Sequence, residues 1–187
     1  MTIICALHAP EEQCTWIGSD TQGNLGEVRS ASPTKWIVHG DWAIGCAGLW
    51  RTANIMLERG DELFDEVDGP FDLTENLRRL LIDEGYSNAR DEKAGGPHDF
   101  GDLSFILASP KAIWSIDRLL GFAPLPAREV TAAGSGRELA YGAAYVAEKA
   151  GMTAEKVIRS AVEAVIDRDI RCGGAPWVRQ LKGQGNG

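Results

Sequence analysis

The sequence has no apolar stretch approaching the roughly 20 residues that a helix needs to span a bilayer. It has no block of Lys and Arg, and its formal net charge of -8 at pH 7 argues against a nucleic-acid partner. It begins without the pattern of a secretory signal peptide. We therefore expect an acidic, cytoplasmic protein that binds neither nucleic acid nor a membrane.

Patterns that bind metals or nucleotides are lacking as well. The four cysteines are widely spaced and form no CxxC pair or Cys/His ligand set, so we expect reduced thiols. They are Cys5, Cys14, Cys46 and Cys172. The three histidines have no ligand-like spacing, and no glycine-rich nucleotide fingerprint is present. We therefore expect that no cofactor is required.

What is present fits an ordinary globular protein. Hydrophobic residues make up 44% of the sequence and charged residues 25%, so disorder is not indicated. With 187 residues, the chain is long enough to bury a full core. The simplest organisation is a single domain over residues 1–187.

The second residue is the first candidate for chemistry. The chain opens with Met1 and Thr2, followed by the β-branched residues Ile3 and Ile4. If Met1 is removed, Thr2 has a free α-amine and a hydroxyl group, which supply a general base and a nucleophile within one residue. Many proteins begin Met-Thr, so an ordinary first strand is the alternative.

A predicted hairpin brings a carboxylate to the chain's start. Two apolar-rich runs, residues 2–8 and 14–20, flank a charged segment with a proline, which is typical of a turn. A turn centred near Glu11 pairs positions whose numbers add up to about 22, and this places Asp20 beside Thr2. Asp20 is therefore a candidate functional residue, with a solvated residue at a strand end as the alternative.

Strand and helix patterns alternate along the rest of the chain. Residues 21–34 are rich in turn formers, and Asp72 and Thr153 are placed to cap helices. A second hairpin turns at Gly40-Asp41, with Lys35 at the head of its first strand. Further strands are expected over 103–108, 112–116, 130–133 and 176–178, and helices over 49–67, after 72, over 137–149 and after 153. This order favours two stacked sheets covered by helices on both sides.

Six short motifs, in this order, resemble one known family. They are Met-Thr at the start, Gly18-Ser19-Asp20, Lys35 followed by apolar residues, Gly45-Cys46-Ala47-Gly48 before a helix, Gly134-Ser135-Gly136 before an alanine-rich helix, and Asp169-Ile170-Arg171-Cys172-Gly173-Gly174. The chain resembles the N-terminal-nucleophile hydrolases of the proteasome β-subunit family, especially the bacterial HslV peptidase type. The resemblance covers residues 2 to about 181. It implies an α+β fold, the four-layer αββα sandwich, with two antiparallel sheets between helical layers.

The resemblance also implies roles for individual residues. Thr2 matches the nucleophile, and its α-amine the general base, because an ordinary α-amine has a pKa near 8. Lys35 matches the active-site lysine, whose charge favours the neutral amine and the ionised hydroxyl. Asp20 matches the carboxylate that holds this lysine.

Three further residues complete the implied catalytic set. The backbone N–H of Gly48 matches the oxyanion donor, with Gly45 as an alternative frame. Ser135 and Asp169 match residues that hydrogen-bond near the threonine amine. Cys46 and Trp50 flank the implied specificity pocket and suggest an apolar substrate side chain.

The chain departs from the family pattern at two positions that bear on the site. Cys172 stands where relatives have Ser or Thr, and a thiol is the weaker hydrogen bonder. Ile3 replaces a small residue. In relatives, backbone carbonyls of the corresponding turn can hold a cation, so Ile166, Asp169 and Cys172 are candidate ligands for a structural Na or Mg ion.

The leading hypothesis is a threonine endopeptidase that hydrolyses unfolded polypeptides inside a stacked homo-oligomeric ring. An ATPase unfoldase is a further candidate partner. If Met1 is retained, the amine is blocked, and a non-catalytic proteasome-like shell subunit becomes the alternative. A small-amide hydrolase with the same N-terminal chemistry is a third hypothesis, which predicts a closed pocket instead of an extended cleft.

Overall fold

Two antiparallel sheets form the centre of the molecule. The computed structural model describes residues 2–25, 28–31, 35–48, 50–86, 100 and 103–183. The first sheet has the strand order β10 (Thr131–Gly134), β1 (Ile3–Ala9), β2 (Cys14–Ser19) and β11 (Trp177–Lys182). The second has the order β5 (Trp36–His39), β6 (Trp42–Ala47), β7 (Ser104–Ala108), β8 (Ile113–Ile116) and β9 (Phe122–Pro124).

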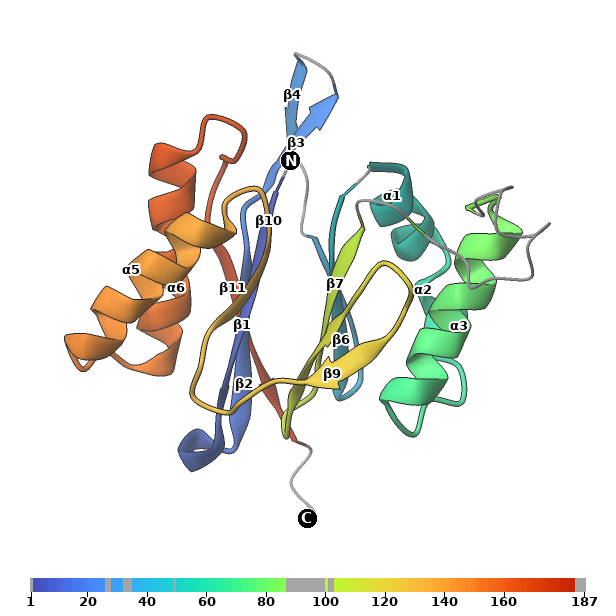
Figure 1. The fold of residues 1–187 in the computed structure, drawn as a ribbon, viewed down its shortest axis with the longest axis horizontal. Helices are drawn as coiled ribbons and strands as arrows, with labels where there is room; N and C mark the ends of the chain where they lie inside the picture. Colours follow the sequence, from blue (N-terminus) through green and yellow to red (C-terminus); the bar gives the residue numbers. More distant parts are fainter. Residues whose placement is uncertain are drawn as a thin grey trace.

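Helices cover both outer faces of the paired sheets. The helices α5 (Arg137–Lys149) and α6 (Ala154–Arg168) lie on the first sheet, and α1 (Trp50–Glu58), α2 (Gly60–Leu63) and α3 (Pro70–Asp83) lie beside the second (Figure 1). The layers follow the order helix, sheet, sheet, helix. The predicted α+β fold with its αββα sandwich is therefore confirmed.

Three apolar layers hold the sandwich together, and strand alternation in β1 explains two of them. Ile3 and Cys5 pack toward α5 and α6, whereas Ile4 and Ala6 pack between the two sheets. The third layer joins the second sheet to α1, α2 and α3, and Leu77 is among its fully buried residues. Both faces of β1 are buried, which is why this strand reads as an unbroken apolar run.

The register of the first hairpin differs from the predicted one by one residue. β1 pairs with β2 through Ile4 and Ser19, and through Ala9 and Cys14 at the turn. The turn contains the 3-10 helix Pro10–Glu12 and then Gln13, whose φ of 51° is left-handed. The hairpin therefore turns half a residue later than at Glu11, and every pair shifts by one.

Residues 21–34 contain strands that the sequence prediction missed. β3 (Gln22–Leu25) and β4 (Val28–Ala31) form a two-stranded ribbon that belongs to neither sheet, while residues 26–27 and 32–34 lie outside the described part. Alternating apolar residues are needed where one face of a strand packs on a core. This ribbon belongs to neither sheet, so the sequence pattern that identifies a strand is weak there. β9 was also missed, and β11 runs to Lys182 instead of ending at residue 178.

The predicted helices are present, with corrections at their ends. The helix predicted over 49–67 is interrupted, because α1 ends at Glu58 and α2 begins at Gly60. Asp72 is the third residue of α3 and not its N-cap residue, which is Gly69. The Asp72 carboxylate nevertheless accepts the Gly69 N–H at 3.0 Å. Thr153 precedes α6 as predicted, but its side chain makes no capping hydrogen bond.

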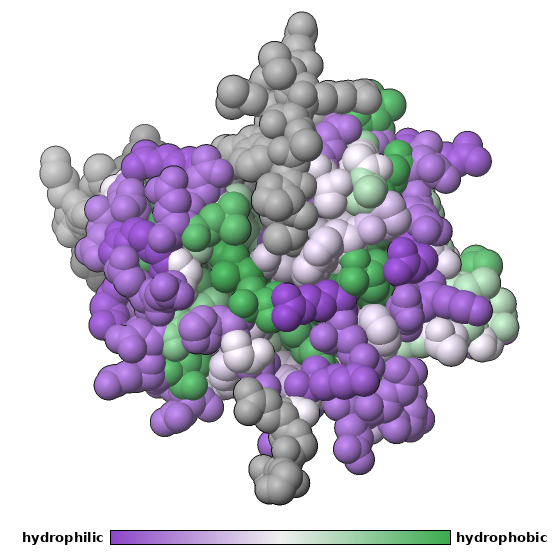
Figure 2. Space-filling model, turned by 180° about the vertical axis from the view of Figure 1, so that it is seen from behind, coloured by the Kyte–Doolittle hydropathy of each residue, from purple (hydrophilic) through white to green (hydrophobic). Residues whose placement is uncertain are grey.

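The surface is mainly hydrophilic. Seen from behind, apolar residues gather in a central band and at one edge of the molecule (Figure 2). The central band lies on the side where the edge strands β11 and β5 are found. Within the described ranges, no helix combines the length and the apolar character needed to cross a membrane.

Candidate active site

The carboxylate of Asp20 joins the chain's start to two distant segments. Asp20 follows β2 directly and is fully buried. Its Oδ1 accepts the Thr2 hydroxyl and the Ile3 N–H, each at 3.0 Å. The same oxygen lies 2.5 Å from Lys35 Nζ, and Oδ2 accepts the Gly173 N–H at 3.2 Å. A buried carboxylate with four such partners is fixed in position.

Lys35 is held as firmly as its partner. Its ammonium donates to Asp20 Oδ1, to the Asp20 carbonyl at 3.0 Å and to the Gln22 carbonyl at 2.8 Å, which accounts for its three protons. Burial lowers the pKa of Lys35 from its usual range, and the Asp20 carboxylate opposes that shift. The structure thus places a positive charge next to the carboxylate that holds the Thr2 hydroxyl.

The backbone of Thr2 lies tightly against Gly134, the last residue of β10. Ile3 pairs with Gly134 in the sheet, and Gly134 has a φ of +108°, which disfavours any other residue. A β-carbon at Gly134 would overlap the Thr2 carbonyl group. Glycine at this position therefore allows the backbone of Thr2, the nucleophile candidate, to pack directly against β10.

The substitution Gly134→Ala is expected to displace Thr2 and to destabilise the fold. The left-handed backbone alone costs about 1–2 kcal/mol with a β-carbon, and the overlap with the Thr2 carbonyl adds to it. The melting temperature should fall by about 4–8 °C, measured by circular dichroism. Gly142→Ala is the matched control, because Gly142 lies in α5 with open space around it and helix propensity favours alanine. Equal melting temperatures for the two variants would contradict this account.

A second cluster forms where α6 ends. Ser135 Oγ donates to Asp169 Oδ2 at 3.3 Å and lies 3.7 Å from Cys172 Sγ. Arg171 donates to the Asp169 carboxylate from its backbone N at 3.0 Å and from Nε at 2.8 Å. These bonds hold the pKa of Asp169 below its usual range, while burial raises the pKa of the Cys172 thiol to about 11. Cys172 therefore stays a neutral thiol that donates weakly to Asp169.

The two clusters are joined through one turn. Besides Gly173, whose N–H reaches Asp20, the Gly173 carbonyl accepts the Thr21 N–H at 3.2 Å, and Ala175 N–H donates to Thr21 Oγ1 at 2.8 Å. The segment after α6 is thus fastened to the end of β2. The structure places Asp20 in contact with both Thr2 and Lys35, with Ser135 and Asp169 in the adjoining cluster.

The two candidate frames for the oxyanion donor can be distinguished. Gly45 lies inside β6, where it pairs with both Trp36 and Ile106, so the sheet occupies its backbone. A β-carbon there would also lie about 2.9 Å from the Trp36 ring. Gly48 follows β6, is exposed and has a φ of 149°. It comes after the last paired residue of β6, so its backbone lies outside the hydrogen-bonded strand pairs of the sheet. The geometry therefore favours Gly48.

A small apolar pocket opens beside Lys35. It lies between the second sheet and α1, and it is lined by Lys35, Ile37, Cys46, Ala53, Met56 and Leu57. Cys46 contributes to it as predicted, whereas the side chain of Trp50 is outside the described part. Its volume is only about 10 Å³, so an apolar group could enter next to the Thr2–Asp20–Lys35 array only if the lining side chains moved apart.

The predicted cation ligands lie together in sequence and remain a prediction. Ile166 is in α6, and the Asp169 carbonyl accepts the Cys172 N–H at 2.9 Å, which leaves it one lone pair. No group of three or more His, Cys, Asp or Glu side chains suited to a metal occurs among the residues that the structure describes. The prediction concerns backbone carbonyls, to which this absence does not apply.

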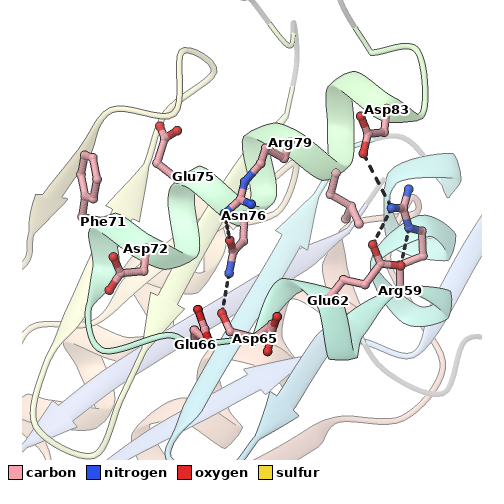
Figure 3. Close-up of a pocket in the computed structure, with 11 residues that line it drawn as sticks. Arg59, Glu62, Asp65, Glu66, Phe71, Asp72, Glu75, Asn76, Arg79 and Asp83 are labelled. Carbon is pink, nitrogen blue, oxygen red and sulfur yellow. Dashed lines mark hydrogen bonds and ion pairs between the residues drawn. The ribbon is translucent and has the colours of Figure 1, made fainter.

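A larger cavity lies away from this array, between α2 and α3 (Figure 3). It has a volume of about 640 Å³ and is lined mainly by charged side chains. Arg59 pairs there with Glu62 and Asp83, and Asn76 donates to the Asp65 carbonyl at 2.9 Å. Among the described residues that line it there is no Ser, Thr or Cys.

Sequence reasoning missed several residues of the site. The Gly173 N–H, the Gln22 carbonyl and the Arg171 guanidinium all contact Asp20, Lys35 or Asp169. Two of these contacts are made by backbone atoms, which carry no sequence signature. Arg171 stands within a quoted motif, and its spacing of two residues from Asp169 is the signal from which the ion pair could be predicted.

Comparisons with solved structures find proteins of the same fold. No protein-family model matches the chain, and no curated protein matches it in sequence. Among solved structures, BPH of Thiobacillus denitrificans in complex with epoxomicin is 19% identical, with a TM-score of 0.78 over 98% of this chain and 100% of that one. A second structure of BPH gives 19% identity and a TM-score of 0.77 over the full length of both chains.

A eukaryotic protein with a similar fold is also found. HslV from Trypanosoma brucei is 24% identical, with a TM-score of 0.69 over 97% of this chain and 99% of that one. The resemblance drawn from the six motifs is thereby confirmed for the fold, which the chain shares with HslV-type proteins along almost its whole length.

Proposed function

We propose that this chain is a proteasome-type threonine peptidase whose nucleophile is Thr2, freed by cleavage of the Met1–Thr2 bond. The observation that carries the proposal is the buried array in which Asp20 Oδ1 accepts the Thr2 hydroxyl and lies 2.5 Å from Lys35 Nζ. A buried lysine–aspartate pair is costly to maintain without a function, and here it touches a potential nucleophile at the start of β1.

The chemistry follows from the free α-amine. The amine takes the hydroxyl proton as the Thr2 oxygen attacks the scissile carbonyl carbon, and the charged Lys35 stabilises the developing alkoxide. The carbonyl oxygen becomes an oxyanion, for which the Gly48 N–H is the donor. The protonated amine then gives its proton to the leaving nitrogen as the C–N bond breaks. Water hydrolyses the resulting ester and frees Thr2.

The proposed substrate is an unfolded polypeptide with an apolar residue on the acyl side of the scissile bond. The small pocket of Ile37, Cys46, Ala53 and Met56 next to Lys35 supports this preference. A small-amide hydrolase would need a closed pocket around Thr2.

We further propose that the chain works as a self-compartmentalised ring. The outer face of α5 supports self-association, because Leu139 is 43% exposed, Tyr145 60% and Val146 66%. An ATPase unfoldase would be a separate chain that supplies the ring with substrate. A carbonyl-bound cation at Ile166, Asp169 and Cys172 would stiffen the turn that holds Asp20.

Intact-mass spectrometry tests the proposal most directly. We expect the purified protein to lack Met1, because a blocked amine cannot act as the base. The Thr2→Ala variant should lose Met1 equally, which would show that trimming does not depend on the Thr2 hydroxyl. A preparation that keeps Met1 throughout and cleaves no fluorogenic peptide would overturn the proposal in favour of a non-catalytic shell subunit.

A further inference from the structure

The helix α5 has apolar residues on both of its faces. Its inward face packs on β1 and α6 through small buried residues, which are Ala140, Ala144 and Ala147. Its outward face has larger side chains, because Leu139, Tyr145 and Val146 are all exposed. A surface helix normally exposes a polar face, and exposed apolar groups that lie together indicate a contact surface. The outward face of α5 is therefore a candidate for contact with another molecule.

Four exposed residues form a stripe along the centre of this face, which we call the α5 stripe. They follow the helical repeat, so they lie on one side of the helix, and they are Glu138, Gly142, Tyr145 and Lys149. Gly142 forms a notch, because open space surrounds the position that its β-carbon would take. The Tyr145 ring stands next along the stripe, and Lys149 Nζ lies 5.4 Å from its centre. The stripe thus has opposite charges at its two ends, with a hollow and a ring between them.

The α5 stripe is complementary to an inverted copy of itself. If two α5 helices run antiparallel with Glu138 opposite Lys149 of the second copy, then Gly142 comes opposite Tyr145 of the second copy. Each tyrosine ring then enters the notch of the other helix, and the ion pair forms twice. Glycine at the contact lets the two backbones approach closely, which accounts for a residue that is otherwise unfavourable inside a helix. One alignment therefore satisfies charge and shape together.

The residues beside the α5 stripe fit the same alignment. Leu139 and Val146 lie on one side of it, so in the pair they come next to the same two residues of the second copy and bury apolar surface. Arg137 and Glu148 lie on the other side, at opposite ends of α5. Glu138 contacts Arg137 at 3.1 Å, but both side chains are exposed and such a pair contributes little. Each end of the helix pair therefore brings together two acidic and two basic residues, whose charges balance.

We propose that two copies of this chain associate through the α5 stripe, with their α5 helices antiparallel across a twofold axis. Such a contact uses the same patch on both copies and joins them only in pairs, whereas a closed ring needs a head-to-tail contact between neighbours. In the ring of the proposed function, on which this step rests, α5 would therefore join one ring to a second ring. A single helix pair is smaller than a standard stable interface of about 1,600 Å². Repetition of the contact around a ring strengthens it.

Complementary charge variants test the alignment. Glu138→Lys places like charges opposite each other at both ends of the stripe, and Lys149→Glu does the same. Alone, each variant should show half the particle mass of the parent protein by mass photometry, with at least about a tenfold higher concentration needed for pairing. Mixed in equal amounts, the two variants should regain the parent mass, because each supplies the charge that the other lacks. Asp61→Lys is the control, because Asp61 is fully exposed and begins α2 in the opposite helical layer (Figure 1).

A size variant tests the notch without a change of charge. Gly142→Phe fills the hollow that would receive the Tyr145 ring of the second copy, so it should also halve the particle mass. The melting temperature of the unpaired chain should not fall, because the site is open and phenylalanine is a better helix former than glycine.

The outcomes separate this inference from the proposed function. A parent protein that never pairs, charge variants that keep the parent mass, or a mixture that does not regain it would each overturn the α5 contact. Cleavage of a fluorogenic peptide is measured on the same samples. If the masses change as expected but no sample cleaves the peptide, the proposed function fails and the α5 contact stands. If the parent cleaves the peptide but its mass does not respond to the charge variants, the α5 contact fails and the peptidase stands.

Discussion

Thr2→Ala is expected to lower kcat/KM for a fluorogenic peptide by at least about 10⁴-fold, because removal of a covalent nucleophile leaves only binding and oxyanion stabilisation. The fold should be unaffected. Thr2 contributes a single hydroxyl contact to Asp20, which still accepts the Ile3 and Gly173 N–H groups and keeps Lys35 as its partner. Peptide turnover, melting temperature and assembly size are the three measurements.

Thr2→Ser is the matched control for this loss. Serine keeps the hydroxyl and the α-amine, so activity should remain within about tenfold of the parent protein. The methyl group of Thr2 lies near Gly134, so serine also loses a packing contact that orients the hydroxyl. Turnover retained by Thr2→Ala at the level of Thr2→Ser would mean that the nucleophile lies elsewhere.

Asp20→Asn is expected to affect both activity and stability. Breaking a buried ion pair costs about 3–5 kcal/mol, because the remaining charge is left without its partner. For a chain of this length, the melting temperature should fall by roughly 10 °C. Peptide turnover should fall by about 10³-fold, since Lys35 is no longer held and the Thr2 hydroxyl loses a charged acceptor.

The same variant predicts a particular pH dependence. Burial already lowers the pKa of Lys35, and the loss of Asp20 removes the main opposing effect, so the pKa falls further. A lysine with a lower pKa in the folded state binds its proton less well than in the unfolded state. The unfolded state then takes up protons, so stability rises with pH between the folded pKa and the ordinary lysine value of about 10.4.

Urea unfolding at pH 7, 8 and 9 measures this effect. The stability of Asp20→Asn should recover toward that of the parent protein as the pH rises. Asp61→Asn is the control, because Asp61 is fully exposed and its variant should match the parent at each pH. A stability deficit that stays constant from pH 7 to pH 9 would contradict the assignment of Lys35 as the unpaired charge.

The parts of the fold that local patterns encode could be predicted from sequence. The turn at Gly40-Asp41 connects β5 and β6 as expected, and the alanine-rich helix has the predicted bounds of Arg137 and Lys149. The adjacency of Thr2 and Asp20 was predicted with a register that was wrong by one residue. It is present nevertheless, because the Asp20 side chain reaches both Thr2 and Ile3 across the end of the hairpin.

The contacts that could not be predicted depend on tertiary packing. Gly173 donates to a carboxylate 153 positions away in sequence, through a backbone N–H that any residue possesses. A cleft beside β10 arises because Ser104, Ser115 and Thr131 come together from three strands, and none of these residues is unusual in its own segment. The β3–β4 ribbon joins neither sheet, so no buried face produces the alternation that identifies a strand.

The Gly173–Asp20 bond has a consequence for the order of events during synthesis. Asp20 is translated long before the residue that donates to its Oδ2, which lies 153 positions later, and before the strand β11 that pairs with β2. A nascent chain therefore cannot complete the contacts of the Asp20 carboxylate until the segment after α6 has also been made. The long loop that this contact closes makes it a late step in folding. If Thr2 is the nucleophile as proposed, the carboxylate that accepts its hydroxyl would reach its final position only after this long-range contact has formed.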